Sequence, residues 1–476
     1  MKSNFKELFS NMLVFAISNI GTKLILFFLV PLYTNYLSSA ELGTADLVTT
    51  TTSLVIPLIT LSITESVYRF SMDSVTDNKE VLRCFYYVYL FSTILSIAGI
   101  AALQFIPSFK PYSLLFVLII LTTIINDGYA LYVKGNGRNK IFAIDNIVYV
   151  ASLAATNIIF LVGLKLGIQG YLLAIVVAKS ISFGFLILFG KTQRFVNPVS
   201  IDRDLLKSML RYSIPLLFNS INWWVISSSD KYMLNYMISS SEVGLYTVAS
   251  KVPALVNTAT TVFTEAWTIS SIKEYEGGQG TGFYNRVFEL FSVSMAILVS
   301  GIMLIARPFM GVYVAESYSD AVRFLPTLLM SAYYLGFSSF IGVTFSTVMK
   351  SKVIMHSSLV AAVLNIIVNF LLIPHIGGLG AAIATMFTYV VISVYRYYHA
   401  QKYMTLTFSK GKFLMTVGIL TIQQIAVTID FHWVVISILA LMAIVIIHMS
   451  TVKNLTTTLV LLIKSRFGGN HGKASD

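Results

Sequence analysis

The chain has 476 residues, of which 56% are hydrophobic and 11% are charged, and its formal net charge is +12. Soluble domains carry about 25% charged residues, so this chain cannot cover a soluble surface and is predicted to be a polytopic membrane protein. The positive charge lies in short loops between apolar segments, which favours a role in membrane orientation over nucleic-acid binding.

The apolar segments divide into about fourteen predicted transmembrane helices, at roughly 20 residues per span. The first of them lacks a small-residue cleavage site and is interpreted as a retained span, not a signal peptide. The thirteenth is short and contains Gln423-Gln424, so it is the weakest of the set. The predicted spans are 11–36, 43–66, 84–106, 112–133, 141–163, 168–190, 208–236, 243–270, 284–306, 324–348, 353–373, 378–399, 412–428 and 432–450.

The loop charges predict the orientation of these spans. With a cytoplasmic N-terminus and alternating loops, most Lys and Arg residues fall on the cytoplasmic side, as the positive-inside rule requires. Both termini are then cytoplasmic. The outer loops contain only Lys110, Lys165, Arg307 and Arg323.

An internal repeat indicates two similar halves. The segment Ser38-Ser39-Ala40-Glu41-Leu42-Gly43 returns about 200 positions later as Ser239-Ser240-Ser241-Glu242-Val243-Gly244. Gly167-Ile168-Gln169-Gly170 likewise resembles Gly377-Gly378-Leu379-Gly380. Repeats of this kind are typical of transporters. We therefore expect an all-α membrane protein with two pseudo-symmetric six-helix lobes (1–195 and 196–405), followed by two extra helices and a cytoplasmic tail (406–476).

The chain offers no pattern for covalent chemistry. Cys84 is the only cysteine, and the six histidines are scattered without metal-binding spacing. No phosphate-binding loop or nucleophile motif is found. The sequence therefore predicts a protein that is not an enzyme and that needs no metal or cofactor.

Four lysines fall within predicted spans, namely Lys23, Lys179, Lys231 and Lys251. A charged side chain at the bilayer centre costs about 2.5–3.5 kcal/mol on insertion scales, so it usually faces a cavity or a partner. None of the four has an acidic residue four positions away on its own helix. They are interpreted as substrate-binding cations for an anionic head group such as pyrophosphate. The alternative is snorkelling, or pairing with Asp46, Asp127 or Asp230 on other helices.

Polar and acidic residues within the spans complete the candidate site. Asn219 and Asn222 are candidates for sugar contacts. Asp127, Glu265 and Glu65 are candidates for energy coupling, although Glu65 precedes Arg69 by four positions and an ion pair between them is the structural alternative.

Several short segments suggest a family for this chain. They are Pro31-Leu32-Tyr33-Thr34-Asn35-Tyr36-Leu37-Ser38, Glu41-Leu42-Gly43, Tyr68-Arg69-Phe70, Ser229-Asp230-Lys231, Glu242-Val243-Gly244-Leu245-Tyr246 and Ala249-Ser250-Lys251. At these segments the chain resembles the polysaccharide flippases (the Wzx type) of the multidrug/oligosaccharidyl-lipid/polysaccharide exporter superfamily. The resemblance covers nearly the whole chain in span number and in the lobe repeat.

The resemblance implies two six-helix lobes around a central cavity, and transport by alternating access. The implied substrate is an undecaprenyl-pyrophosphate-linked oligosaccharide for surface polysaccharide such as O-antigen, capsule or exopolysaccharide, moved from the inner to the outer leaflet of the bacterial cytoplasmic membrane. Lys23 and Lys251 match positions where relatives contact pyrophosphate, and the last two spans resemble the helices that hold the lipid tail there. Membrane lipids, a polysaccharide polymerase and glycosyltransferases are candidate partners.

Two alternatives belong to the same superfamily: a multidrug or cation antiporter, and a flippase for the peptidoglycan-precursor lipid. A cationic-drug exporter is expected to rely on cavity carboxylates, and most have only twelve spans. A membrane polymerase or acyltransferase is disfavoured because no outer loop exceeds about twenty residues.

Overall fold

The computed structural model describes residues 21–73, 76–105, 109–190, 201–276, 280–404 and 406–453, and this part of the chain is helical with no β-strand. Nine of its helices are long and apolar enough to cross a membrane, which confirms the predicted all-α polytopic fold. The helices of the first half are α2 (Val30–Tyr36), α3 (Ser39–Thr60), α4 (Ile63–Ser71), α5 (Asn78–Leu103), η1 (Lys110–Tyr112), α6 (Ser113–Gly135), α7 (Asn139–Asn157), the π-helix η2 (Ile158–Gly163) and α8 (Gly167–Phe189). Those of the second half are α9 (Arg203–Met237), α10 (Ser240–Glu276), α11 (Gly280–Tyr313), η3 (Glu316–Arg323), α12 (Leu325–Thr347), α13 (Ser351–Ala400), α14 (Lys410–Thr428) and α15 (Trp433–Ile447).

Two breaks in the backbone separate the helices from the predicted span limits. The predicted span 43–66 ends early, because Leu61 and Ser62 both have left-handed backbone angles (φ 50° and 54°) and separate α3 from α4. Conversely, the predicted spans 353–373 and 378–399 lie within α13. This helix is interrupted at Ile376 and Gly377, where Gly377 has φ 55° and ψ −134°.

The chain divides into two compact units. The first comprises Met1–Val248, Tyr313–Tyr318 and Asn369–Gly378, and the second comprises Ala249–Val312, Ser319–Val368 and Leu379–Asp476. α9 and the first turns of α10 thus pack with the first unit. The lobe limits predicted from the repeat (1–195 and 196–405) stay a prediction, because they describe the symmetry of the sequence and not these units.

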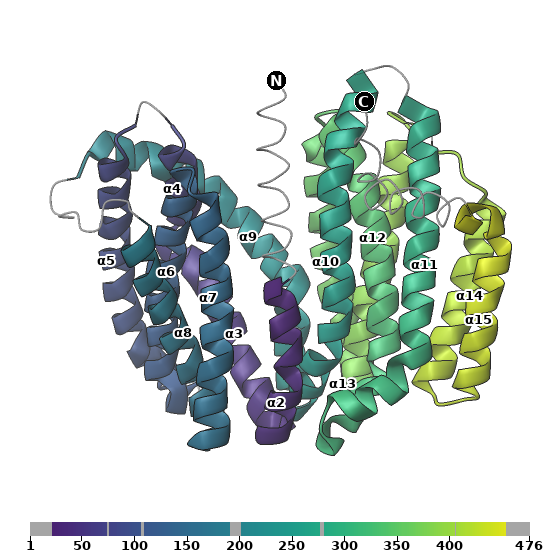
Figure 1. The fold of residues 1–476 in the computed structure, drawn as a ribbon, viewed down its shortest axis with the longest axis horizontal. Helices are drawn as coiled ribbons and strands as arrows, with labels where there is room; N and C mark the ends of the chain where they lie inside the picture. The colour runs from purple at the N-terminus through teal and green to yellow at the C-terminus, as the bar shows by residue number, and fades with distance from the viewer. Residues whose placement is uncertain are drawn as a thin grey trace, which may run out of the picture. The chain divides into compact units, whose positions relative to one another are not determined.

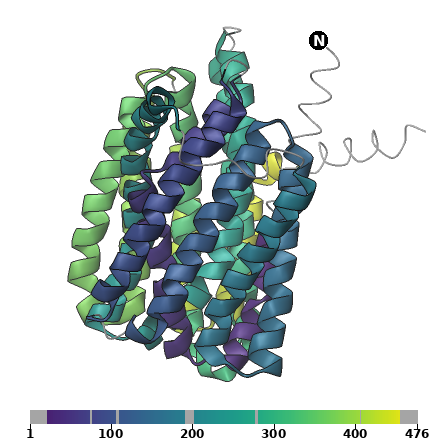
Figure 2. The same ribbon diagram turned by 90° about the vertical axis from the view of Figure 1, so that its left-hand side faces the viewer.

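Helix α6 lies at the centre of the first unit. It packs against α4, α5 and α8, and α8 also packs along α7 (Figure 2). Tyr129 and Tyr132 of α6 are fully buried, as is Phe85 of α5. A Cβ atom on Gly128 would lie 2.1 Å from the Phe85 ring, so glycine allows this close approach.

The two copies of the repeated segment contact each other at the starts of α3 and α10, both within the first unit. The Ser39 and Ser241 hydroxyls lie 2.6 Å apart. A Cβ atom on Gly43 would lie 1.9 Å from the Ser240 carbonyl oxygen, and one on Gly244 would lie 2.0 Å from the Ser39 carbonyl oxygen. Because the overlaps are with backbone atoms, only glycine fits at both positions. We call these helix starts the repeat seam.

The glutamate of each copy lies at the start of another helix. The Glu41 carboxylate accepts hydrogen bonds from the Ser38 amide and hydroxyl and lies beside Gly167, the first residue of α8. Glu242 accepts a 2.8 Å bond from the amide of Gly378, just after the interruption in α13. A carboxylate at a helix N-terminus is favourable because it meets free amide groups and the positive end of the helix dipole. The repeated motif therefore stabilises two corresponding helix junctions.

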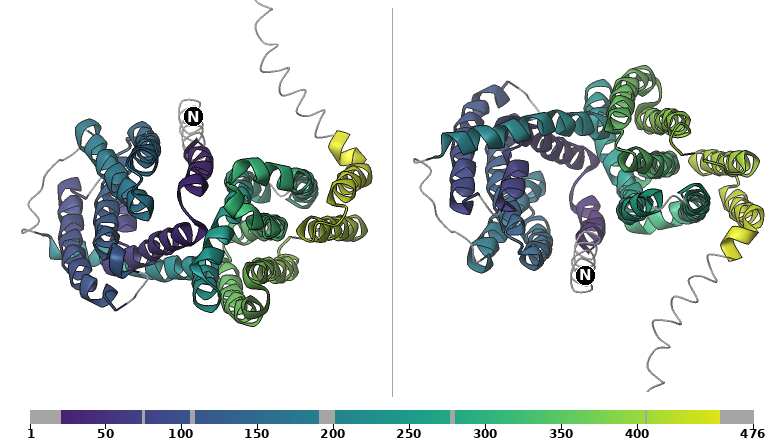
Figure 3. Two further views of the ribbon diagram at one scale, coloured as in Figure 1. Left: turned by 90° about the horizontal axis from the view of Figure 1, so that it is seen from below. Right: turned by 90° about the horizontal axis from the view of Figure 1, so that it is seen from above.

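In the second unit, α14 and α15 run side by side and α14 packs against α12 (Figures 1 and 3). Gln423 and Gln424, which made the thirteenth predicted span the weakest, are buried, and their side-chain amides are hydrogen-bonded. The Gln423 amide exchanges two hydrogen bonds with Ser300, and Gln424 donates to the Thr327 hydroxyl. Hydrogen bonds between side chains are a usual form of helix association in membranes.

Candidate functional site

Helices α9 and α10 are the most distinctive spans of the chain. They are 35 and 37 residues long, yet they are too polar to be among the nine apolar helices of the described residues. A long polar helix in a membrane protein faces a partner or a water-filled cavity, because polar groups exposed to lipid are costly. The polar residues of these helices are therefore candidates for the transport path.

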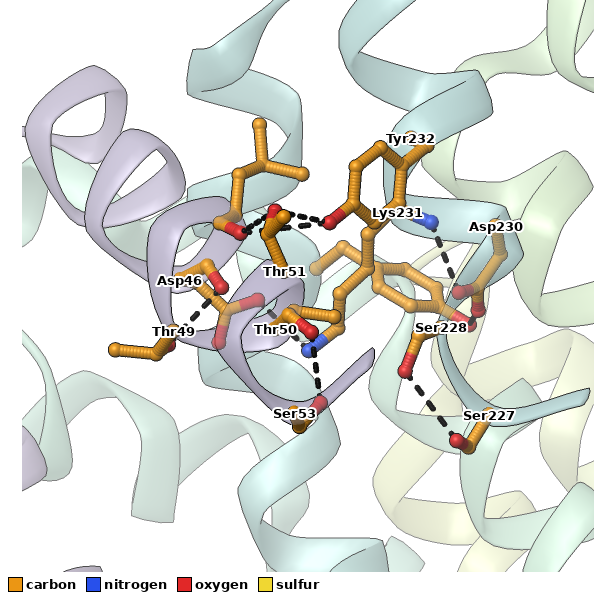
Figure 4. Close-up of polar contacts among 12 residues, drawn as sticks. Asp46, Thr49, Thr50, Thr51, Ser53, Ser227, Ser228, Asp230, Lys231 and Tyr232 are labelled. Atoms are coloured by element: carbon orange, nitrogen blue, oxygen red, sulfur yellow. Dashed lines mark hydrogen bonds and ion pairs between the residues drawn. The ribbon is translucent and has the colours of Figure 1, made fainter. Parts of the chain in front are cut away.

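Lys231 of α9 forms an ion pair across the unit with Asp46 of α3. Its Nζ lies 2.7 Å from Asp46 Oδ2, and the two side chains are 16% and 13% exposed (Figure 4). The pairing that the sequence left as an alternative is thus present. Because a paired ammonium is already neutralised, Lys231 binds an external anion only if the pair opens.

The same cluster includes a second carboxylate. Asp230 is buried and accepts hydrogen bonds from the Tyr246 hydroxyl of α10, at 2.7 Å, and from the Lys231 amide, at 2.8 Å. Thr51 of α3 forms a hydrogen bond with the Tyr232 hydroxyl of α9 (Figure 4). Side chains of α3, α9 and α10 are thereby joined next to the repeat seam.

Lys179 of α8 is also paired. Its Nζ donates to Asp127 Oδ1 of α6 at 2.6 Å and to Asn126 Oδ1 at 3.3 Å, and it lies 4.5 Å from the centre of the Tyr149 ring. For both Lys179 and Lys231, the alternative of pairing with an aspartate on another helix is therefore the one present. These contacts come from helices remote in sequence, which residue spacing along a single helix does not reveal.

The remaining binding candidates have different surroundings. Lys23 is exposed, and no ion pair joins it to a described acidic residue. On α9, Asn219 is exposed, Asn222 is half-buried and Trp223 is 53% exposed. Lys251 of α10 is half-buried and belongs to the second unit.

The coupling candidates differ in burial as well. Glu265 and Glu65 are both exposed, and no ion pair joins Glu65 to the exposed Arg69. Asp127 is the one that contacts a buried cation. No group of three or more metal-binding His, Cys, Asp or Glu side chains occurs among the described residues.

Two functional features were not found from the sequence. Asp145 of α7 is only 2% exposed and lies on a cavity of about 260 Å³ together with Asp127 and Lys179. Its position between apolar residues in a predicted span was the available signal.

In the second unit, an apolar cavity of about 390 Å³ lies between α11, α12, α13 and α14. Its lining includes Phe288, Tyr334, Phe337, Tyr397, Phe413 and Lys410.

Comparison with known proteins gives a family match and a more distant relative. A family model described as "Polysaccharide biosynthesis protein" matches residues 8–268, more than half of the chain. The chain is 22% identical over 210 residues to the probable low-salt glycan biosynthesis flippase Agl15 of Haloferax volcanii. This match covers 42% of the chain and 43% of the relative, so it spans less than half of that protein's length.

Solved structures share the fold. The lipid II flippase MurJ in an inward closed conformation matches with a TM-score of 0.71 at 12% identity, covering 92% of this chain and 100% of that chain. An inward-facing multidrug resistance MATE family transporter of the MOP superfamily matches with a TM-score of 0.56 at 15% identity, covering 81% of this chain and 94% of that chain. At these identities the likeness concerns architecture alone.

Proposed function

Since the chain belongs to the polysaccharide biosynthesis protein family, we propose that it is a flippase for an oligosaccharide linked to undecaprenyl pyrophosphate. It moves this lipid from the inner to the outer leaflet of the bacterial cytoplasmic membrane by alternating access, with both termini in the cytoplasm. Glycosyltransferases supply the substrate and a polymerase uses the product to build surface polysaccharide.

The observation that carries the cargo assignment is the contrast among the lysines. Lys179 and Lys231 have carboxylate partners at 2.6 and 2.7 Å, whereas Lys23 is exposed with no ion pair to a described residue. An exposed ammonium in a predicted span needs an anion, and pyrophosphate supplies one. Lys23 therefore binds the pyrophosphate, and Lys251 of the second unit stays a separate candidate.

Two further features suit the rest of this substrate. Asn219 and Trp223 present an amide and an exposed ring on the polar helix α9, a combination that can hydrogen-bond to sugar hydroxyls and cover the apolar face of a sugar. The aromatic cavity beside α14 accepts part of the polyprenyl chain, with Lys410 at its lining. The polar and apolar ends of the cargo thus have separate sites.

The experiment replaces Lys23 in a strain whose glycan export depends on this protein. Lys23→Ala is expected to abolish surface glycan and to accumulate the lipid-linked oligosaccharide, while Lys23→Arg retains export. Lys165→Ala, at an exposed loop lysine, is the matched control. Full export by Lys23→Ala at normal membrane abundance would exclude this site. Rescue of a strain lacking its peptidoglycan-precursor flippase, or resistance to cationic dyes, would instead favour the two related transport functions.

A further inference from the structure

The carboxylate of Asp145 in the first unit is buried and is not among the groups proposed to bind the cargo. Asp145 of α7 is 2% exposed, and its Oδ1 accepts a 2.6 Å hydrogen bond from the Ser182 hydroxyl of α8. The Ser182 hydroxyl in turn accepts a 2.8 Å bond from the Asn126 amide of α6. No cation lies within ion-pair distance of Asp145 among the residues that the structure describes.

The hydrogen bonds connect Asp145 to a second carboxylate. Asn126 Oδ1 accepts from Lys179 Nζ at 3.3 Å, and the same Nζ is 2.6 Å from Asp127 Oδ1. The chain of contacts therefore runs Asp145–Ser182–Asn126–Lys179–Asp127 across three helices. The Lys179 ammonium is thus linked to two carboxylates. It contacts Asp127 directly and is connected to Asp145 through Asn126 and Ser182.

The charges of this cluster do not balance without a proton. Two ionised carboxylates and one ammonium give a net charge of −1, and an unpaired charge buried within a membrane span is costly enough that the group is neutralised instead. Among the residues that the structure describes, no second cation forms an ion pair with either carboxylate. Tyr149 of α7 lies under Lys179, Lys134 of α6 lies over the Tyr68 and Phe142 rings, and on α3 Asp46 is paired with Lys231.

A route for exchange of that proton is present. The cavity of about 260 Å³ is lined by both carboxylates, Lys179 and the polar Asn146 and Tyr149. This volume is enough for several water molecules. The Asp127 side chain is 48% exposed, whereas the Lys179 side chain is 13% exposed.

We propose that Asp145 is a binding site for one exchangeable proton and that Lys179 alternates between the two carboxylates. When a cavity water transfers a proton to Asp145, the neutral acid leaves the ammonium to Asp127, as in this structure. When Asp145 returns the proton to water, Lys179 moves to its carboxylate. In the first transfer an O–H bond of a hydronium ion breaks as the Asp145 O–H bond forms, leaving water, and in the second the reverse exchange restores the hydronium ion. The use of the cycle to drive cargo transport rests on the proposed function, but proton binding itself does not.

Infrared difference spectroscopy of the purified full-length protein in lipid vesicles tests the site without any cargo. The wild type should show a carbonyl band, lost as the pH is raised, that contains a contribution of one protonated carboxyl group per chain from Asp145. Asp145→Asn should remove this contribution. Asp127→Asn should also remove it, although Asp145 is intact, because Lys179 then pairs with Asp145 and keeps it ionised. Asp204→Asn, at an exposed aspartate in the first turn of α9, should retain it.

A band of unchanged intensity in Asp145→Asn, or its absence from the wild type, would overturn proton binding at Asp145. A band unchanged in Asp127→Asn would overturn the alternation of Lys179, and this isosteric change at a half-exposed side chain leaves the fold intact. In cells, glycan export by the wild type should fall when the proton gradient is collapsed. Export that ignores the gradient would refute the coupling while leaving the flippase assignment standing.

Discussion

The repeat seam gives the sharpest structural prediction, the effect of Gly43→Ala. The added methyl would lie 1.9 Å from the Ser240 carbonyl oxygen and 2.8 Å from the Gly244 amide nitrogen. Both atoms belong to the backbone, so α3 and α10 must move apart to regain ordinary contact. Overpacking of this kind typically costs about 1–3 kcal/mol. The intrinsic preference of a helix for alanine over glycine returns about 0.8–1.0 kcal/mol.

Thermal unfolding of the purified protein in nanodiscs, with a matched glycine as control, measures this effect. Gly99 lies within α5 and has no neighbouring atom within 4 Å of the point where an added methyl would lie, so Gly99→Ala should gain the helix preference without overlap. We therefore expect Gly43→Ala to be the less stable variant by roughly 1–3 kcal/mol, since both share the same propensity gain. Equal stability of the two variants would refute the close packing of the two repeat copies.

Three further predictions concern the same region. Asp46→Asn should destabilise the protein by about 3–5 kcal/mol in denaturation assays, because it leaves the Lys231 ammonium unpaired inside the protein. The double variant with Lys231→Met should recover much of this loss. Additive losses from the two substitutions would contradict the pairing. Glu242→Ala should cost about 1–3 kcal/mol by the same assay, since it leaves a helix-start amide without its acceptor; an unchanged stability would contradict this capping role. Ser39→Cys combined with Ser241→Cys should form a disulfide, seen by gel mobility, because the two hydroxyls lie 2.6 Å apart; failure to cross-link under oxidising conditions would contradict the contact between the repeat copies.

The fold could be predicted in outline because span length and loop charge are properties of single segments. Most span limits needed no tertiary information, since about 20 apolar residues must cross the bilayer whatever their neighbours are. The break at Leu61 and Ser62 was not predictable in this way. Neither residue is a glycine or an asparagine, the types that most often adopt left-handed angles. The local sequence therefore gives no signal for the break.

The site was predictable in its residue types but not in its pairings. Intramembrane lysines are rare enough to be noticed one by one. Their partners are far away in sequence, because Lys231 and Asp46 are 185 positions apart and Lys179 and Asp127 are 52 apart. Periodicity identifies neighbours on one helix only. Which lysine is paired within the protein is decided by helix packing.

Residues that occur in both copies of the repeat consequently have a different role from residues that occur in one copy only. Glu41 and Glu242 lie beside corresponding glycines, and Gly43 and Gly244 each face a serine carbonyl oxygen of the other copy, so a substitution there acts first on the architecture. A binding site for an asymmetric cargo cannot be built from equivalent groups alone, because its pyrophosphate and its sugar need different chemistry. The candidate cargo-binding lysines have no basic counterpart in the other copy. Lys23→Ala is therefore expected to lower export without affecting stability, whereas Gly43→Ala is expected to lower both export and stability.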